Sequence, residues 1–410
     1  MTAFSDVSIE AACSRIIDYR GKTPPKSSSG VRLVTAKVIK DGRINEEPAE
    51  YIEADFYDAW MRRGLPVQWD VLITTEAPLG EVAVLRTPDK VALAQRAILL
   101  RGDPKIVDQR YLFCALRSPT VQTRLVARAT GTTVLGIKQS ELRQVLLPLP
   151  NLQAQRRIAS ILGAYDDLIE VNRRRIAVLE EMARRLFEEW FVHFRFPGHG
   201  GATEGAPTGP PTDWQQSTFG ALVTEHRDTL DPTDIDTSTT YIGLEHIPRR
   251  STTLAATGSA EQVTSTKLRF ARGDILFGKI RPYFHKVAWA PFDGICSTDA
   301  IVWRPRSADL AGLALAVASS DAFVAHSVQT SNGTKMPRAN SSVLLRYPVL
   351  LPAIELLRRF NENVMANARL AALLQAANLK LASSRDLLLP RLISGDLPIT
   401  TAERDLEAVA

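Results

Sequence analysis

The chain has 410 residues, of which 45% are hydrophobic and 23% are charged, with a net charge of +5. This composition is typical of globular proteins and argues against extensive disorder, and the length predicts two or three domains. The sequence has no apolar run of the roughly 20 residues that a membrane span needs, and residues 1–13 lack the layout of a secretory signal. We therefore expect a cytoplasmic protein with no membrane partner. Three distant cysteines, Cys13, Cys114 and Cys296, argue against a disulfide framework or a thiolate metal site.

An internal repeat organises the chain. Residues 131–150 read GTTVLGIKQSELRQVLLPLP, and residues 333–352 read GTKMPRANSSVLLRYPVLLP, so Gly, Thr, Leu and the closing Pro recur 202 positions later. Further matching segments follow the same order: 9–18 with 219–228, 34–39 with 242–247, and 69–85 with 273–289. Such self-similarity along most of both halves predicts a duplicated structural unit.

Each copy begins with a globular part, predicted at residues 1–150 and 214–352. Short runs rich in Val, Ile and Leu, such as VLITT and DILF, predict strands, while brief stretches such as YLFCALRS predict helices. The sequence therefore predicts two similar α+β domains.

A long helix is predicted after each globular part, at residues 151–195 and 353–395. Apolar and small residues recur there three and four apart, which indicates a heptad seam. The first seam comprises Ile158, Ile161, Tyr165, Leu168, Asn172, Leu179, Met182 and Leu186, with Arg175 out of line; the second comprises Phe360, Val364, Asn367, Leu370, Leu374, Ala377, Leu381, Ser384 and Leu388. Because one helix alone leaves its seam exposed, we expect the two to pack as an antiparallel coiled coil. Asn172 and Asn367 either fix the register or lie at a frayed surface.

Two segments lack such periodicity. Residues 196–213 are rich in Gly, Pro and Thr, which predicts a flexible linker between the halves. Residues 396–410 are predicted to be a frayed C-terminal tail.

Catalytic signatures are missing from the sequence. It contains no phosphate-binding loop, HExxH helix, GxSxG elbow or GxGxxG fingerprint, and its six histidines are not paired at metal-ligand spacing. Asp89 followed by Asp103 and Lys105 formally resembles the carboxylate and lysine set of Mg²⁺-dependent nucleases. Pro104 is unsuited to the strand that such a site needs, and RGDPK is more typical of a turn. We therefore favour a protein that binds rather than catalyses and keep a nuclease as the alternative.

Basic residues cluster in the globular parts. Residues 20–43 hold seven basic residues against one acid, and residues 267–286 hold six against one. Such clusters favour a polyanion partner, because neutralising phosphates releases condensed counterions. FGKIRPYFHK, at residues 277–286, is a candidate base-reading loop, although the clusters could also be solvated faces of a coiled-coil scaffold. The candidate DNA-binding residues are Arg20, Lys22, Lys26, Lys37, Lys40, Arg43, Lys138, Lys279, Arg281, Tyr283, Lys286, Lys335 and Arg338.

The order of these motifs resembles the specificity subunits of type I restriction-modification systems. DYRGKTPPK (residues 18–26), the WDVLITT and GDILFGK strands, the two repeated endings and the heptad helices carry the resemblance, which extends over residues 8–397. It implies two target recognition domains, each of which reads one half of a split site in double-stranded DNA, joined by an antiparallel coiled coil. It also implies a subunit with no catalysis, cofactor or metal of its own.

The resemblance further implies partners. These are two modification (methyltransferase) subunits that use S-adenosylmethionine and two restriction (translocase and endonuclease) subunits that use ATP and Mg²⁺. The second globular part departs from the pattern, because it carries HRDTLDPTD (residues 226–234) where the first carries RGKTPPK. A specificity subunit of a related system, whose partner fuses nuclease and methyltransferase, would give the same sequence pattern.

Overall fold

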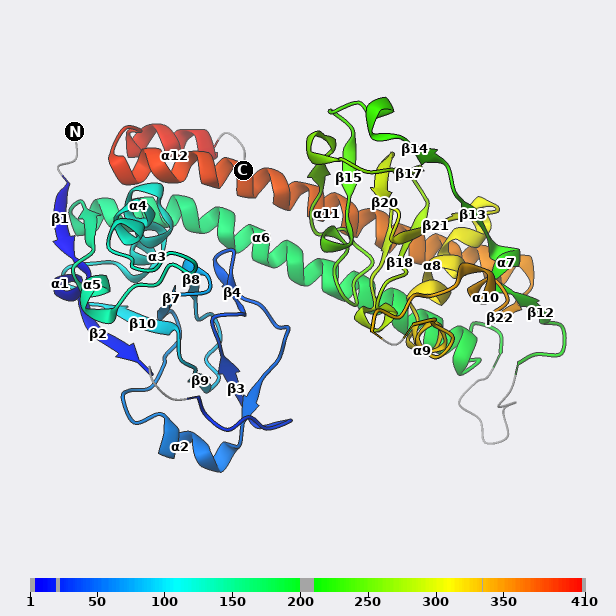
Figure 1. The fold of residues 1–410 in the computed structure, drawn as a ribbon, viewed down its shortest axis with the longest axis horizontal. Helices are drawn as coiled ribbons and strands as arrows, with labels where there is room; N and C mark the ends of the chain where they lie inside the picture. The colour runs from blue at the N-terminus through cyan, green and yellow to red at the C-terminus, as the bar shows by residue number, and fades with distance from the viewer. Residues whose placement is uncertain (1–3, 20–22, 200–209, 334, 408–410) are drawn as a thin grey trace. The chain divides into compact units, whose positions relative to one another are not determined.

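The computed structural model describes residues 4–19, 23–199, 210–333 and 335–407. The chain forms two compact units (Figure 1). Unit 1 comprises residues 1–167 and 381–410, and unit 2 comprises residues 168–380. Each unit therefore contains one globular part and a portion of both long helices.

A four-stranded antiparallel sheet forms the centre of unit 1. Its strand order is β2 (Cys13–Asp18), β10 (Ala97–Gly102), β7 (Val71–Thr75) and β8 (Leu79–Val84). All five residues of β7 are buried because helices cover one face of the sheet and a smaller sheet covers the other. The smaller sheet has the order β6 (Tyr51–Ile52), β3 (Val31–Val34) and β9 (Val91–Leu93). Two further strand pairs are β1 (Ser5–Ser8) with β11 (Leu146–Leu149) and β4 (Ile39–Lys40) with β5 (Arg43–Ile44). The helices of the globular part are α1 (Ile9–Ala12), η1 (Ala54–Phe56), α2 (Tyr57–Trp60), α3 (Gln109–Arg117), α4 (Pro119–Ala127) and α5 (Gln139–Arg143).

Unit 2 repeats this framework. Its four-stranded sheet has the order β13 (Val223–His226), β21 (Ala300–Pro305), β18 (Ile275–Gly278) and β19 (Val287–Trp289), which matches unit 1 strand for strand. A five-stranded sheet has the order β14 (Thr229–Leu230), β17 (Lys267–Phe270), β20 (Gly294–Ser297), β15 (Thr240–Ile242) and β16 (Gly258–Ser259). The other elements are β12 (Gln215–Thr218) paired with β22 (Pro348–Leu351), α7 (Phe219–Leu222), η3 (Pro232–Asp234), η4 (Leu244–His246), η5 (Ala260–Gln262), η6 (Pro282–Phe284), η7 (Ala308–Leu310), α8 (Ala311–Ser319), α9 (Asp321–Gln329) and α10 (Ser341–Leu344).

Detailed contacts recur in both units as well. Strand β3 runs parallel to β9 with Val34 opposite Leu93, and β15 runs parallel to β20 with Ile242 opposite Cys296. Val34 and Ile242 are equivalent in the sequence alignment of the two halves. The predicted duplication into two similar α+β domains is thus confirmed.

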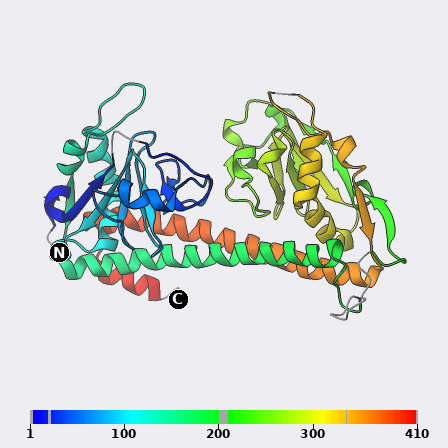
Figure 2. The same ribbon diagram turned by 90° about the horizontal axis from the view of Figure 1, so that it is seen from below.

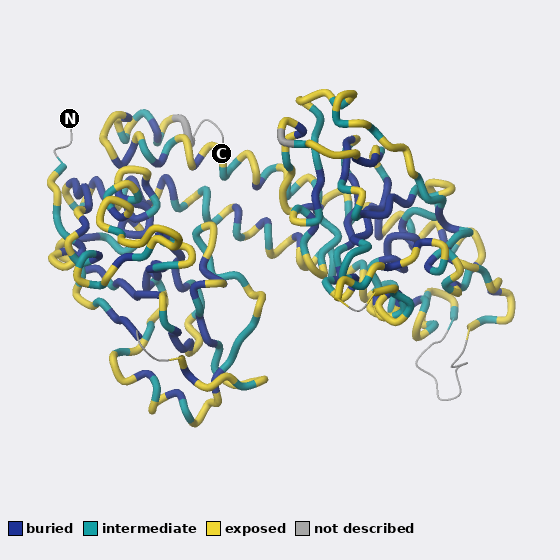
Figure 3. Tube along the Cα trace, in the orientation of Figure 1, coloured by how far each residue is buried: buried dark blue, intermediate teal, exposed yellow. Residues whose placement is uncertain are grey.

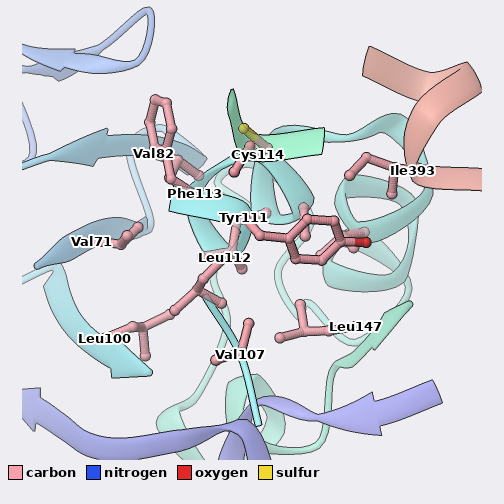
Figure 4. Close-up of a cluster of buried hydrophobic side chains, with 14 of the residues drawn as sticks. Val71, Val82, Leu100, Val107, Tyr111, Leu112, Phe113, Cys114, Leu147 and Ile393 are labelled. Atoms are coloured by element: carbon pink, nitrogen blue, oxygen red, sulfur yellow. The ribbon is translucent and has the colours of Figure 1, made fainter. Parts of the chain in front are cut away.

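The core of unit 1 is built around α3. Asp108 caps this helix by accepting hydrogen bonds from the amides of Arg110 and Tyr111. The ring of Tyr111 is fully buried and its hydroxyl donates to the carbonyl of Pro148 at 2.6 Å, so the buried polar atom is satisfied. Figure 4 shows Tyr111 among Leu100, Leu147 and other apolar side chains. The buried segments in Figure 3 follow the central strands in each unit.

Two long helices were predicted and both are present. Helix α6 spans Leu152–Phe187 and continues as a π-helical turn, η2 (Glu188–Val192), while α11 spans Ile354–Ser394. In unit 2 the amide of Asn172 donates to Asn378 at 3.0 Å, and Asn367 donates to the carbonyl of Leu179. Residue numbers rise along one helix as they fall along the other, so the predicted antiparallel pairing is confirmed.

The predicted seam of α6 is wrong at two of its eight residues. Leu168 and Met182 are 46% and 54% exposed, whereas Ile169 and Ile176 are buried. Apolar residues are adjacent at 168–169, so the sequence pattern alone fits two stripes one residue apart. The structure selects the stripe that contains Ile176, which also explains why Arg175 did not fit the other one.

The C-terminal segment also differs from the prediction. Residues Ile399–Glu407 form helix α12, so a frayed tail at 396–410 is wrong for most of that range. Ala402 is buried and Glu403 forms an ion pair with Arg157 of α6 at 2.6 Å, because one face of α12 packs on unit 1. Most of the predicted linker, residues 200–209, lies outside the described residues.

Within the described residues, no single helix is long and apolar enough to cross a membrane. The bent pair Ala308–Ser319 and Asp321–Gln329 passes that test on length and composition alone.

Candidate nucleic-acid interface

In unit 1 a closed loop lies beside the turn that joins β7 to β8. This loop, residues 130–136, is called the first loop. It is closed by two hydrogen bonds between the backbones of Thr130 and Gly136, at 2.8 and 2.9 Å. The amide of Ile137 then donates to the carbonyl of Thr75 at 2.9 Å, which fixes the loop to the end of β7. Gly131 has a φ of +114°, and a Cβ there would lie 2.2 Å from the carbonyl oxygen of Val134. A glycine is therefore required for this compact loop.

Unit 2 contains the same arrangement. In the second loop, residues 332–338, the backbones of Asn332 and Arg338 are joined by hydrogen bonds of 3.1 and 2.9 Å. The amide of Ala339 donates to the carbonyl of Lys279 at 2.8 Å, as Ile137 does in unit 1. Thr334, within this loop, lies outside the described residues. The repeated sequence at 131–150 and 333–352 thus begins with a loop that each unit holds against its central sheet.

The predicted base-reading residues of unit 2 gather at this loop. Arg281 adopts a left-handed conformation with φ 49°, and its amide donates to the carbonyl of Pro337 in the second loop at 2.8 Å. Tyr283 is 52% exposed and meets Phe284 edge-on. The structure therefore brings together five candidate residues: Lys279, Arg281, Tyr283, Lys335 and Arg338.

Lys286, in contrast, has a structural contact. Its ammonium donates to the carbonyl of Leu244, and burial lowers the pKa of Lys286. The neighbouring His285 is buried, with Nε2 2.8 Å from the carbonyl of Ser319 and Nδ1 3.4 Å from Asp321. Burial lowers the pKa of His285, which favours the neutral imidazole. These two residues hold the η6 turn that presents Tyr283.

A cavity of about 320 Å³ lies beside the first loop in unit 1, and Lys138 and Arg96 contribute to its lining. Arg96 forms an ion pair with Glu76 at 2.7 Å. Gln95 donates to the hydroxyl of Thr23 at 3.0 Å, which places the segment after the RGK motif close to this cavity. Sequence reasoning missed Arg96 because it lies outside both basic runs.

Arg96 and Asp299 occupy equivalent positions in the two units. The amide of Thr75 donates to the carbonyl of Arg96, and the amide of Lys279 donates to the carbonyl of Asp299, each at 2.9 Å. A cation in unit 1 is thus replaced by an anion in unit 2 on the same backbone framework. The two surfaces are therefore chemically different.

The other basic candidates of unit 1 lie elsewhere. Lys26 forms an ion pair with Glu50 at 2.7 Å. Lys40 and Arg43 are opposite each other on the β4–β5 hairpin, which bridges to β8 at Ala83, and Lys37 precedes this hairpin with an exposed side chain. Arg20 and Lys22 lie outside the described residues.

The residues of the nuclease alternative occupy turns. The carboxylate of Asp103 accepts a hydrogen bond from the amide of Lys105 at 2.9 Å, and Asp89 accepts one from the hydroxyl of Thr87. The predicted turn at RGDPK is confirmed. In the described part of the chain no group of three or more His, Cys, Asp and Glu side chains could hold a metal ion.

Two similar α+β domains, each with a basic loop site and a share of two antiparallel helices, define a class of internally duplicated α+β proteins. Residues 65–181 match the family model described as Type I restriction modification DNA specificity domain. Over 95% of its length the chain is similar to the crystal structure of a type I restriction-modification S subunit from M. genitalium, with a TM-score of 0.58, 14% identity and coverage of 96% of that chain.

Sequence relatives agree with this fold. The chain is 32% identical over 167 residues to the type I restriction enzyme MjaIX specificity subunit of Methanocaldococcus jannaschii, an alignment that covers 41% of this chain and 34% of that protein. It is 23% identical over 313 residues to the EcoDI specificity subunit of Escherichia coli, which covers 69% and 68% of the two chains. The predicted resemblance to type I restriction-modification specificity subunits is confirmed. The family model matches part of the chain, and the alignment with the MjaIX subunit spans about one third of that protein's length.

Proposed function

We propose that this protein is a non-catalytic, sequence-specific DNA-recognition subunit of a restriction-modification complex. Unit 1 reads one half of a split target in double-stranded DNA, and unit 2 reads the other. The observation that carries this proposal is the pair of loop sites, which share one backbone framework but differ in side-chain charge at Arg96 and Asp299. Two different readers on one repeated scaffold suit an asymmetric, bipartite site.

Partner subunits would supply the chemistry. The names of the relatives, specificity subunits of restriction enzymes, support binding to modification and restriction subunits, and we infer two copies of each from the internal repeat. Those partners would use S-adenosylmethionine, ATP and Mg²⁺. A repeated chain offers each of two identical partners a similar surface, so two copies could bind in equivalent ways. The cytoplasm, where the genome is accessible, is the compartment that fits this function.

The paired helices would set the number of unread base pairs between the half-sites. Insertion of seven residues into both α6 and α11 keeps the heptad phase and adds about 10.5 Å of helix. At about 3.4 Å per base pair, we expect the spacer to grow by about three base pairs. An unchanged spacer in that variant would refute the proposal that the paired helices set the spacer length.

The recognition role is tested at Lys279 and Arg281. Duplexes selected from a random library by the full chain define the wild-type site. The K279A/R281A variant should then bind with relaxed preference in one half-site, because each good contact to a base edge discriminates by about 1–3 kcal/mol. The control K380A removes one positive charge from an exposed position on α11 and should keep the preference of both halves. Equal weakening on every sequence would assign Lys279 and Arg281 to phosphate contacts.

A further inference from the structure

The tips of both loops expose apolar side chains. Val134 and Leu135 of the first loop are 55% and 44% exposed, and Met336 of the second loop is 43% exposed. Met336 lies 202 residues after Val134, so the two occupy the same place in the repeat. Single exposed apolar side chains are common on protein surfaces. Here an exposed apolar side chain recurs at the same position of a duplicated loop, which indicates a shared role.

The first loop is built to keep its tip exposed. The two hydrogen bonds between Thr130 and Gly136 close it, and Gly131 permits the tight approach to the carbonyl of Val134. The loop is also fixed at its base by the hydrogen bond from Ile137 to Thr75. Because of these constraints, Val134 and Leu135 remain in water instead of folding back onto the sheet.

The surroundings of the tips are basic. Val134 lines the same cavity as Arg96 and Lys138. Met336 is next to the exposed Lys335, and Pro337 accepts the hydrogen bond from the amide of Arg281. An apolar point with a cationic rim is complementary to a nucleic-acid duplex, in which stacked bases lie between two rows of phosphates. Arg96 is already paired with Glu76, but a protein partner with an apolar face would offer no counter-charge to Lys138 or Lys335.

We propose that Val134 with Leu135, and separately Met336, are wedges that insert between neighbouring base pairs of the two half-sites. This inference rests on the proposed function and adds to it a mechanical role, the local unstacking of DNA. Leu and Met are among the side chains that open base steps in this way, and Figure 2 shows the first loop, in teal, projecting from unit 1. The wedged step should be a flexible pyrimidine–purine step, and its unstacking would assist a partner that must extrude a base for methylation.

The test uses 2-aminopurine, whose fluorescence rises when it is unstacked. The full chain is mixed with its selected duplex, in which the probe replaces each position of both half-sites in turn. Wild-type protein should raise the fluorescence at one step in each half-site. V134S/L135S should lose the rise in the first half-site only, and M336S should lose it in the second only. The control V126S changes an apolar side chain of α4 that is 51% exposed and should retain both signals.

Two results would overturn the wedge proposal. One is a wild-type complex with no fluorescence rise at any step, and the other is a rise that persists in both loop variants. If the first result comes with weaker binding when thymine is replaced by uracil, the tips contact thymine methyl groups instead of unstacking bases. If the chain still prefers one DNA sequence in these cases, only the wedge proposal fails and the proposed function stands. A chain that selects no preferred duplex would refute both the wedge proposal and the proposed function.

Discussion

In each unit a buried carboxylate at an equivalent position, Asp70 or Asp274, holds the central sheet, and its removal should loosen that unit alone. Asp70 follows a turn in unit 1 and accepts hydrogen bonds from the amide of Val67 at 2.8 Å and from Arg101 at 2.7 and 2.8 Å. Asp274 does the same in unit 2 with Ala271 and Arg304. Both aspartates are about 1% exposed. D70A and D274A therefore form a matched pair of perturbations.

The size of the destabilisation depends on the arginine that each variant leaves without its carboxylate partner. Removal of one partner from a buried ion pair destabilises a protein by about 3–5 kcal/mol. The side chains of Arg101 and Arg304 are 30% and 41% exposed, so water partly solvates the guanidinium that loses its partner. We therefore expect each variant to lower the free energy of opening of its own unit by about 2–3 kcal/mol.

Hydrogen exchange followed by mass spectrometry separates the two units. Amides of β7 and β10 should exchange about 30- to 150-fold faster in D70A, because every 1.4 kcal/mol corresponds to a factor of about ten. Amides of β18 and β21 should respond in the same way to D274A. D89A, which removes an exposed carboxylate, serves as the control. Faster exchange in both units from either single variant, or no acceleration in either, would refute this reasoning.

Three further predictions concern single positions. N172L should destabilise unit 2 by about 1–3 kcal/mol, because the buried side-chain oxygen of Asn378 loses its donor, and N172L/N378L should recover this in urea unfolding; an unchanged single variant would contradict this contribution to stability. Because burial lowers the pKa of His285 from 6.5, the unfolded chain binds the proton more tightly. His285 therefore contributes stability above about pH 6.5 that is lost as the pH falls toward 5, and H285Q should show a flatter urea midpoint between pH 8 and 5 than wild type; an equal slope would exclude this origin. G131A should open the first loop and weaken preference in the first half-site alone, as measured by binding to the selected duplex; an equal loss in both halves would contradict this assignment.

The duplicated framework could be predicted from the sequence because strand pairing and loop closure leave local patterns. The repeat from Gly131 and from Gly333 marks two loops with the same hydrogen bonds, and the Gly at each start has a positive φ. The predicted limits of the second long helix lie within one residue of those of α11, and the predicted limits of the first lie within three residues when η2 is counted with α6. Heptad periodicity is a strong signal over ten turns.

Other features depend on contacts between distant residues. The seam of α6 was misplaced by one position at Leu168 and Met182, since only the partner helix decides which of two adjacent stripes is covered. Helix α12 was missed because its stability comes from packing, including the ion pair between Arg157 and Glu403. Arg96 joins the site only through the fold, which carries it next to Glu76 and the first loop.

Two readers in one chain should recognise two separate half-sites of one duplex. Selection of duplexes from a random library by the full-length chain, followed by sequencing, tests this most directly. We predict two different specified segments separated by a fixed number of unspecified base pairs. A single uninterrupted site, two identical half-sites or the recovery of no preferred sequence would contradict the account.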